Sequence, residues 1–108
     1  MTRILSVTIV FAFVASSAFA QSAVEKGKAV YTAQKCSICH SVAGTGNKKG
    51  ELDHIGAKLS ESDLRSWITN APDMAAKAKA DRKPPMKAYG TLTKDEVDSL
   101  VAYLQTLK

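Results

Sequence analysis

The sequence predicts a small all-α domain, and two observations carry that prediction. Three segments begin with Ser or Thr followed three residues later by Asp or Glu, the arrangement in which a hydroxyl caps a new helix. They start at Ser22, Ser60 and Thr93, and apolar residues at helical spacing follow each start. No stretch shows the sustained alternation of apolar and polar residues that is typical of a half-buried strand.

Each start predicts one main helix. The first is expected over residues 23–35, the second over 61–70 and the last over 94–107. Pro72 discourages continuation of the second helix. A shorter helix is predicted over residues 73–80 from alanine content alone. The remaining residues are expected to form long loops, which in a compact domain usually carry function.

Residues 1–20 predict a cleaved signal peptide, and residues 21–108 form the one predicted domain. A basic start precedes an apolar run that ends in Ala-Phe-Ala at residues 18–20, the small-residue pattern of a signal-peptidase site. We expect cleavage after Ala20 and export to a periplasm, with no stable membrane insertion afterwards. The alternative is an uncleaved anchor, because the apolar run is close to the roughly 20 residues that span a bilayer.

The predicted mature domain has little material for a core. All three phenylalanines lie in residues 1–20, so the core must rely on Trp67, three tyrosines and aliphatic side chains. Chains below about 70–80 residues usually need a disulfide, a metal or a cofactor, and the predicted domain of 88 residues is close to that limit.

Without Arg3, 14 basic and 10 acidic residues give the predicted domain a net charge of +4. The charges lack the clustering with aromatic residues that nucleic-acid binders show, so we expect no nucleic-acid partner.

The segment Cys36-Ser37-Ile38-Cys39-His40 carries the strongest chemical signal. Residues three and four apart share one face of a helical turn, so Cys36, Cys39 and His40 can point toward one object. Two thiols can add to the two vinyl groups of a haem, and a histidine directly after the second thiol can bind its iron. This pattern indicates attachment of one covalent c-type haem.

Three other uses of the cysteines account for fewer features of the sequence than haem attachment does. A thioredoxin-like redox pair would need a βαβ context, which the chain does not predict. A structural zinc site needs four ligands, so His54 would have to join the cluster. A disulfide between Cys36 and Cys39 leaves His40 and the helical pattern unexplained.

The second axial position of the iron has three candidate ligands: Met86, Met74 and His54. We predict Met86, because Pro84 and Pro85 stiffen the chain that leads to it. Met74 falls in a predicted helix, where methionine more often fills space. Met/His ligation raises the reduction potential, and two occupied axial positions favour electron transfer over catalysis at the iron.

With this motif near the N-terminus, Met86 toward the C-terminus and flanking helices, the chain resembles small soluble monohaem class I cytochromes c. The resemblance covers essentially all of residues 22–108. It implies a cytochrome c fold in which three main helices and a short one wrap around the haem. It also implies that the first and last helices cross closely, with Gly27, Tyr31 and Tyr103 at the contact.

The resemblance further implies roles around the haem. In this family the histidine ligand usually donates its other ring N–H to a backbone carbonyl, and Glu51 is expected to provide that carbonyl here. Trp67 is expected near the haem propionates, with core packing as the alternative. Tyr89 is expected at the haem edge or as a residue that closes the loop.

The predicted function is that of a periplasmic one-electron carrier and not of an enzyme. Its partners are expected to be redox proteins with acidic docking surfaces, and the carrier itself is expected to be a monomer. The alternatives are a haem subunit of an oxidase or dehydrogenase complex and a haem ligand sensor or peroxidase. The basic residues that could steer acidic partners are Lys48, Lys49, Lys77, Lys79, Arg82, Lys83 and Lys87.

Overall fold

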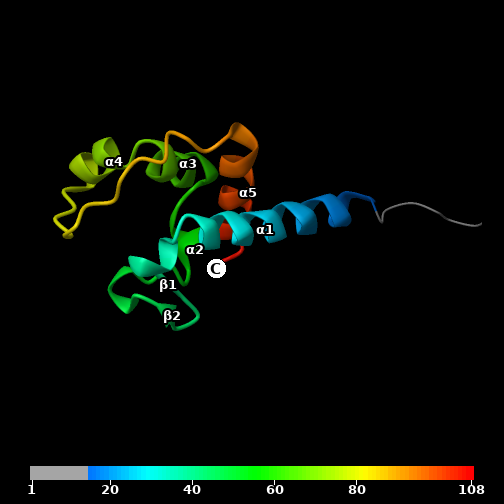
Figure 1. Cartoon of the computed structure of the whole chain (residues 1–108), viewed down its shortest axis with the longest axis horizontal. Coiled ribbons are helices and arrows are strands. Elements are labelled where there is room, and N and C mark those ends of the chain that lie inside the picture. The colour runs from blue at the N-terminus through cyan, green and yellow to red at the C-terminus, as the bar shows by residue number, and fades with distance from the viewer. Residues whose placement is uncertain (1–14) are drawn as a thin grey trace, which may run out of the picture.

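The structure, a computed structural model, describes residues 15–108 and confirms the all-α prediction. Most of the predicted signal peptide, residues 1–14, lies outside the described range, so its cleavage stays a prediction. Figure 1 shows α1 and α5 crossing, with α3 and α4 to one side of α5. None of the helices within residues 15–108 is long and apolar enough to span a membrane.

Helix α1, Ala15–Ala33, starts earlier and ends earlier than the predicted range. The prediction that Ser22 caps this helix is wrong for the chain as described, because Ser22 lies inside it. Neither glycine nor proline interrupts residues 15–21, so nothing in that stretch stops the helix from extending. At the other end, Lys35 adopts a left-handed conformation with φ 56° and turns the chain away.

The next two predicted helices start at or near their predicted positions. Helix α3, Glu61–Thr69, begins at the Ser60 cap, whose Oγ accepts a hydrogen bond from the Asp63 N–H at 3.1 Å. Helix α4, Ala71–Ala78, begins two residues before the prediction, because Pro72 lies in its first turn, where a missing N–H costs nothing.

Helix α5, Lys94–Gln105, has the full capping box that the sequence predicts. The Thr93 hydroxyl accepts from the Glu96 N–H, and the Glu96 carboxylate accepts from the Thr93 N–H. The helix ends two residues before the predicted end. Thr106 donates its hydroxyl to the Tyr103 carbonyl at 2.6 Å, which uses a carbonyl of the last turn.

Short elements that the sequence did not predict fold the segment between α1 and α3. One of them, at residues 55–58, packs against the C-terminal helix, and the Gly56 N–H there donates to the nearby Leu107 carbonyl at 2.7 Å. Two of these elements are the 3₁₀ turns η1, Cys36–Ile38, and η2, Lys48–Gly50. The others are the antiparallel strands β1, Ser41–Val42, and β2, Thr45–Gly46, and helix α2, Ile55–Lys58.

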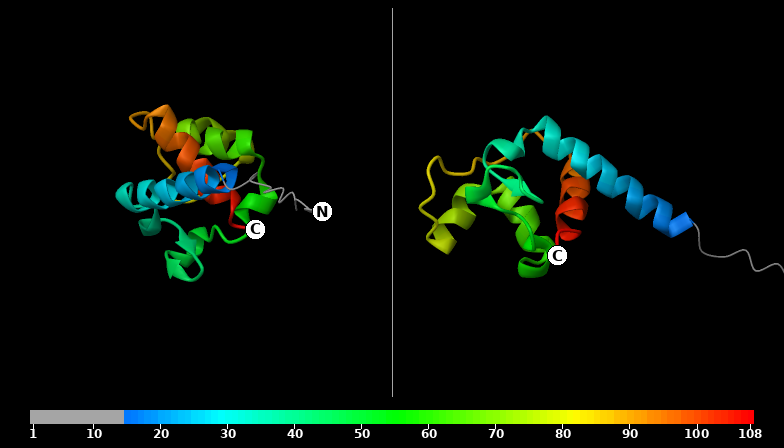
Figure 2. Two further views of the ribbon diagram at one scale, coloured as in Figure 1. Left: turned by 90° about the vertical axis from the view of Figure 1, so that its right-hand side faces the viewer. Right: turned by 90° about the horizontal axis from the view of Figure 1, so that it is seen from below.

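Helices α1 and α5 pack closely where Gly27 meets Ser99 and Tyr103. A Cβ on Gly27 would overlap the Ser99 carbonyl oxygen and would lie 2.7 Å from the Tyr103 Cβ. One turn later, the rings of Tyr31 and Tyr103 meet edge to face with centroids 5.7 Å apart. The structure thus confirms the predicted close crossing, which Figure 2 shows from two further sides.

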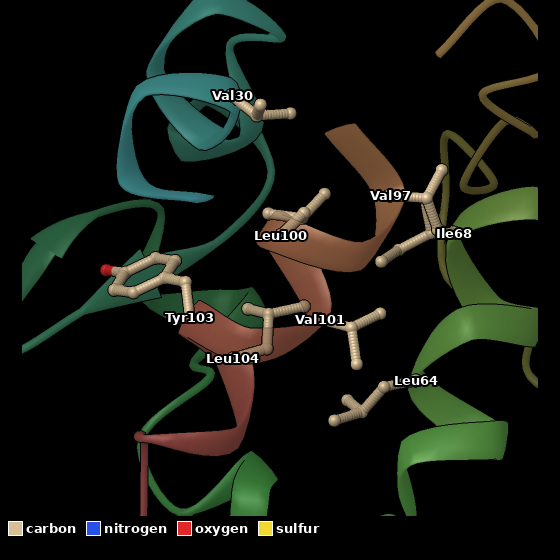
Figure 3. Packing of buried hydrophobic residues seen from close by; sticks show 8 residues of the cluster. All are labelled: Val30, Leu64, Ile68, Val97, Leu100, Val101, Tyr103 and Leu104. Carbon is tan, nitrogen blue, oxygen red and sulfur yellow. The ribbon is translucent and has the colours of Figure 1, made fainter. Parts of the chain in front are cut away.

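The apolar core joins three helices. In Figure 3, Leu100 and Val101 of α5 lie between Val30 of α1 and the side chains Leu64 and Ile68 of α3. Residues Val97, Tyr103 and Leu104 complete the buried cluster on α5.

Candidate functional site

A cavity of about 670 Å³ lies next to this core and contains most of the predicted site residues. Its walls come from the end of α1, the Cys-x-x-Cys-His turn, helices α2 to α5 and the loop before α5. The volume falls within the range of about 300–1,000 Å³ that is typical of ligand sites. The apolar wall consists of Leu52, Ile55, Leu59, Leu64, Ile68, Ala75, Ala80, Leu100 and Leu104.

One tight turn brings Cys36, Cys39 and His40 to the cavity wall. The backbone N–H groups of Cys39 and His40 both donate to the Cys36 carbonyl, at 3.1 and 2.9 Å. Both thiols are half-buried and unlinked, and burial raises the pKa of Cys36. The side chains that the motif places on one face therefore do share one cavity.

The orientation of the His40 ring is set by a backbone carbonyl. Its Nδ1 lies 2.8 Å from the Gly50 carbonyl oxygen, so an Nδ1–H donor leaves Nε2 without a proton. Burial lowers the pKa of His40, which favours the neutral ring that binds metals, although the hydrogen bond to Gly50 opposes this shift.

The prediction that Glu51 supplies this carbonyl is wrong by one residue. The His40 Nδ1 contact is with Gly50, whereas Glu51 is exposed and pairs with Ser41 in an isolated β-bridge. Gly50 can take the position because a Cβ there would lie only 2.9 Å from His40 Nδ1 and would overlap the Cys39 carbonyl oxygen.

Asn47 holds the same loop, and sequence reasoning missed it. Its backbone N–H donates to the His40 carbonyl at 3.0 Å, and its Nδ2 donates to the Ile38 carbonyl at 3.1 Å. Its Oδ1 also accepts from the Lys49 N–H and so caps η2. The one signal available was an asparagine directly after Gly46, which indicates a turn but not the partners of its hydrogen bonds.

Of the three candidate iron ligands, Met86 lines the cavity, together with Pro84 and Pro85. Met74 lies half-buried on α4 and His54 is exposed, and neither belongs to the lining residues that the structure describes. The structure therefore places Met86, and not the other two, in the same cavity as His40.

The two aromatic residues predicted near the cofactor also line this cavity. Trp67 reaches it from α3, and Tyr89 reaches it from the loop before α5. The Tyr89 N–H donates to the Ile68 carbonyl at 2.9 Å, which ties that loop to α3. The bond from Trp67 to a propionate stays a prediction.

One residue of the predicted basic surface, Arg82, is not fully exposed. Lys48, Lys49 and the lysines near Met86 are exposed, but Arg82 is half-buried. Its Nη2 donates to the Cys39 carbonyl at 2.6 Å, so its charge points into the fold and not toward solvent.

The residues present fit a covalently held haem. A mostly apolar cavity of suitable size has two neighbouring thiols, an oriented imidazole and a thioether sulfur among its lining groups. These are the donor types from which c-type attachment and Met/His ligation are built.

Comparison with known proteins agrees with this chemistry. Residues 24–108 match the family model described as Cytochrome c. The chain is 28% identical over 92 residues to cytochrome c oxidase subunit 2 of Alkalihalophilus pseudofirmus, an alignment that covers 77% of this chain and 25% of that protein. No solved structure matches the chain. The chain belongs to the cytochrome c family, whose members carry electrons with a covalently bound c-type haem.

Proposed function

We propose that the chain is an exported one-electron carrier with Met/His-ligated iron. Cys36 and Cys39 would hold the haem through thioether bonds, and His40 and Met86 would bind its iron. The observation that carries this proposal is that all four residues line one cavity. The fixed Nδ1 of His40 supports it, since the other ring nitrogen is then the one available to the iron.

Electron transfer follows from this ligand set. When bound, the haem supplies an iron that gains and loses one electron. Met86 offers a neutral, soft sulfur that favours Fe(II), and two protein ligands leave no open position for a substrate. The lining of the cavity is mostly apolar, and such a lining would keep solvent reorganisation small when the charge of the iron changes.

Redox partners with acidic docking surfaces fit the surface charge. Lys77, Lys79, Lys83 and Lys87 are exposed near the loop that carries Met86. A cationic surface of this kind speeds encounters with acidic partners and makes the rate fall as salt increases. The predicted export signal favours a periplasmic location, and the carrier is expected to act as a monomer.

The ligation is tested by comparing Met86→Ala with Met74→Ala. The ferric wild-type protein should show a weak far-red sulfur-to-iron band, which Met86→Ala should lose and Met74→Ala should keep. Reduced Met86→Ala should bind carbon monoxide, whereas the wild type should not. Carbon monoxide binding to the reduced wild type at neutral pH would instead indicate a ligand sensor or peroxidase.

A second candidate function is that of an electron-transfer subunit within an oxidase or dehydrogenase complex. The similarity to cytochrome c oxidase subunit 2 favours it, although the aligned region spans only a quarter of that protein. Size-exclusion chromatography of whole cells solubilised in a mild detergent separates the two candidates. A carrier should elute alone, while a subunit should elute with a fixed stoichiometry of partner chains.

A further inference from the structure

Arg82 connects the two loops that carry the proposed iron ligands. It lies four residues before Met86, yet its guanidinium reaches the turn that contains His40. The Nη2 atom donates to the Cys39 carbonyl oxygen at 2.6 Å, a contact between residues 43 positions apart. The neighbouring Lys83 carries the same charge but is exposed.

The position of the guanidinium depends on the missing side chain of Gly50. A Cβ at this position would overlap both Arg82 Nη1 and the Cys39 carbonyl oxygen. The same glycine accepts the hydrogen bond from His40 Nδ1 at 2.8 Å. Arg82, Gly50 and the His40 ring therefore form one packed group on the histidine side of the site.

Two hydrogen bonds hold the Met86 loop, one on each side of the methionine. Arg82 binds the Cys39 carbonyl before it, and the Tyr89 N–H binds the Ile68 carbonyl at 2.9 Å after it. The chain between them, residues 83–88, has no regular secondary structure. Loss of either bond would free one end of this segment and increase the conformations open to Met86.

We propose that Arg82 is a positioning residue that holds Met86 against the iron and, through its permanent charge beside His40, favours the reduced state. This inference rests on the proposed Met/His ligation. Loss of one hydrogen bond from a charged group should weaken the hold on Met86 by about tenfold or more. The Arg82 side chain is half-buried, and a charge in such a position is screened less by salt and water than an exposed one.

The experiment compares Arg82→Gln and Arg82→Lys with the control Lys83→Gln in the haem-loaded protein. Imidazole added to the ferric protein competes with Met86 for the iron, so its apparent affinity measures how firmly Met86 is held. Arg82→Gln should bind imidazole about tenfold more tightly than wild type, as expected for one lost charged hydrogen bond. Its reduction potential should also fall.

The other two variants separate geometry from charge. Arg82→Lys keeps the charge but loses the planar fork, so imidazole affinity should rise while the potential falls less than in Arg82→Gln. Lys83→Gln removes an adjacent charge without touching the Cys39 carbonyl, so both quantities should stay at the wild-type value. If Arg82→Gln does not accumulate with haem, Arg82→Lys carries the test.

Several outcomes overturn the inference. Wild-type imidazole affinity and potential in Arg82→Gln would do so while leaving the ligation intact, provided that the ferric wild type shows its sulfur-to-iron band. Equal shifts of imidazole affinity and reduction potential in Lys83→Gln and Arg82→Gln would show that the effect comes from surface charge in general. Absence of the band from the wild type would refute the proposed ligation itself and, with it, the role of Arg82.

Discussion

A Cβ at position 27 would overlap the Ser99 carbonyl oxygen, so the contact between α1 and α5 depends on a residue without a side chain. The same is true at Gly50, where a side chain would displace both Arg82 and the Cys39 carbonyl. At Gly27 the family resemblance was enough to predict the contact. At Gly50 it was not, because the position of a carbonyl in an irregular loop depends on hydrogen bonds that form only after folding.

Gly27→Ala should lower the free energy of unfolding by about 1–3 kcal/mol, the usual cost of forcing extra volume into a packed contact. Chemical denaturation followed by helical circular dichroism measures this. Gly90→Ala is the control, because nothing lies within 4 Å of a Cβ built there. A stability of Gly27→Ala equal to that of Gly90→Ala would contradict the close crossing.

Tyr31 should ionise at unusually high pH. Burial, with smaller contributions from Cys36 and Tyr103, raises its pKa from 10.0 to about 12. Because the unfolded pKa is the lower one, this group stabilises the fold fully below pH 10, and that stabilisation is lost as the pH rises through about 12. A titration of tyrosinate absorbance should show a step near pH 12 that Tyr31→Phe removes. A Tyr31 step near pH 10 would show that the phenol is exposed.

The starts of α3 and α5 could be predicted from the sequence, whereas the helix ends could not, for a physical reason. The caps at Ser60 and Thr93 use groups within three residues of one another, so local chemistry fixes them. The ends depend on residues in the left-handed backbone conformation, such as Lys35 and Lys79. A lysine in the sequence does not predict that conformation. Arg82 was assigned to the surface because its partner lies 43 residues away, beyond any local pattern.

Thr93→Ala should destabilise the protein by about 1 kcal/mol, because the first turn of α5 loses the hydroxyl that accepts from Glu96 N–H. Thermal unfolding should show the loss as a lower midpoint temperature. Thr91→Ala, at an exposed position two residues earlier, is the matched control and should have little effect. Equal midpoints for the two variants would show that the capping box contributes nothing to stability.

At the scale of the whole molecule, the packed cluster of three helices borders a large apolar cavity. The apolar core without a cofactor is small, as the sequence predicted, because the domain after residue 20 has no phenylalanine. A haem in the cavity would complete the core as well as provide the redox centre, so attachment and folding should depend on each other.

The intact mass of the exported protein tests the covalent haem most directly, compared with a double variant carrying Cys36→Ala and Cys39→Ala. The wild type should exceed the mass of its mature polypeptide by one haem, and the double variant should carry no added mass and fold poorly. A wild-type mass equal to that of the bare polypeptide, in colourless material, would contradict the account.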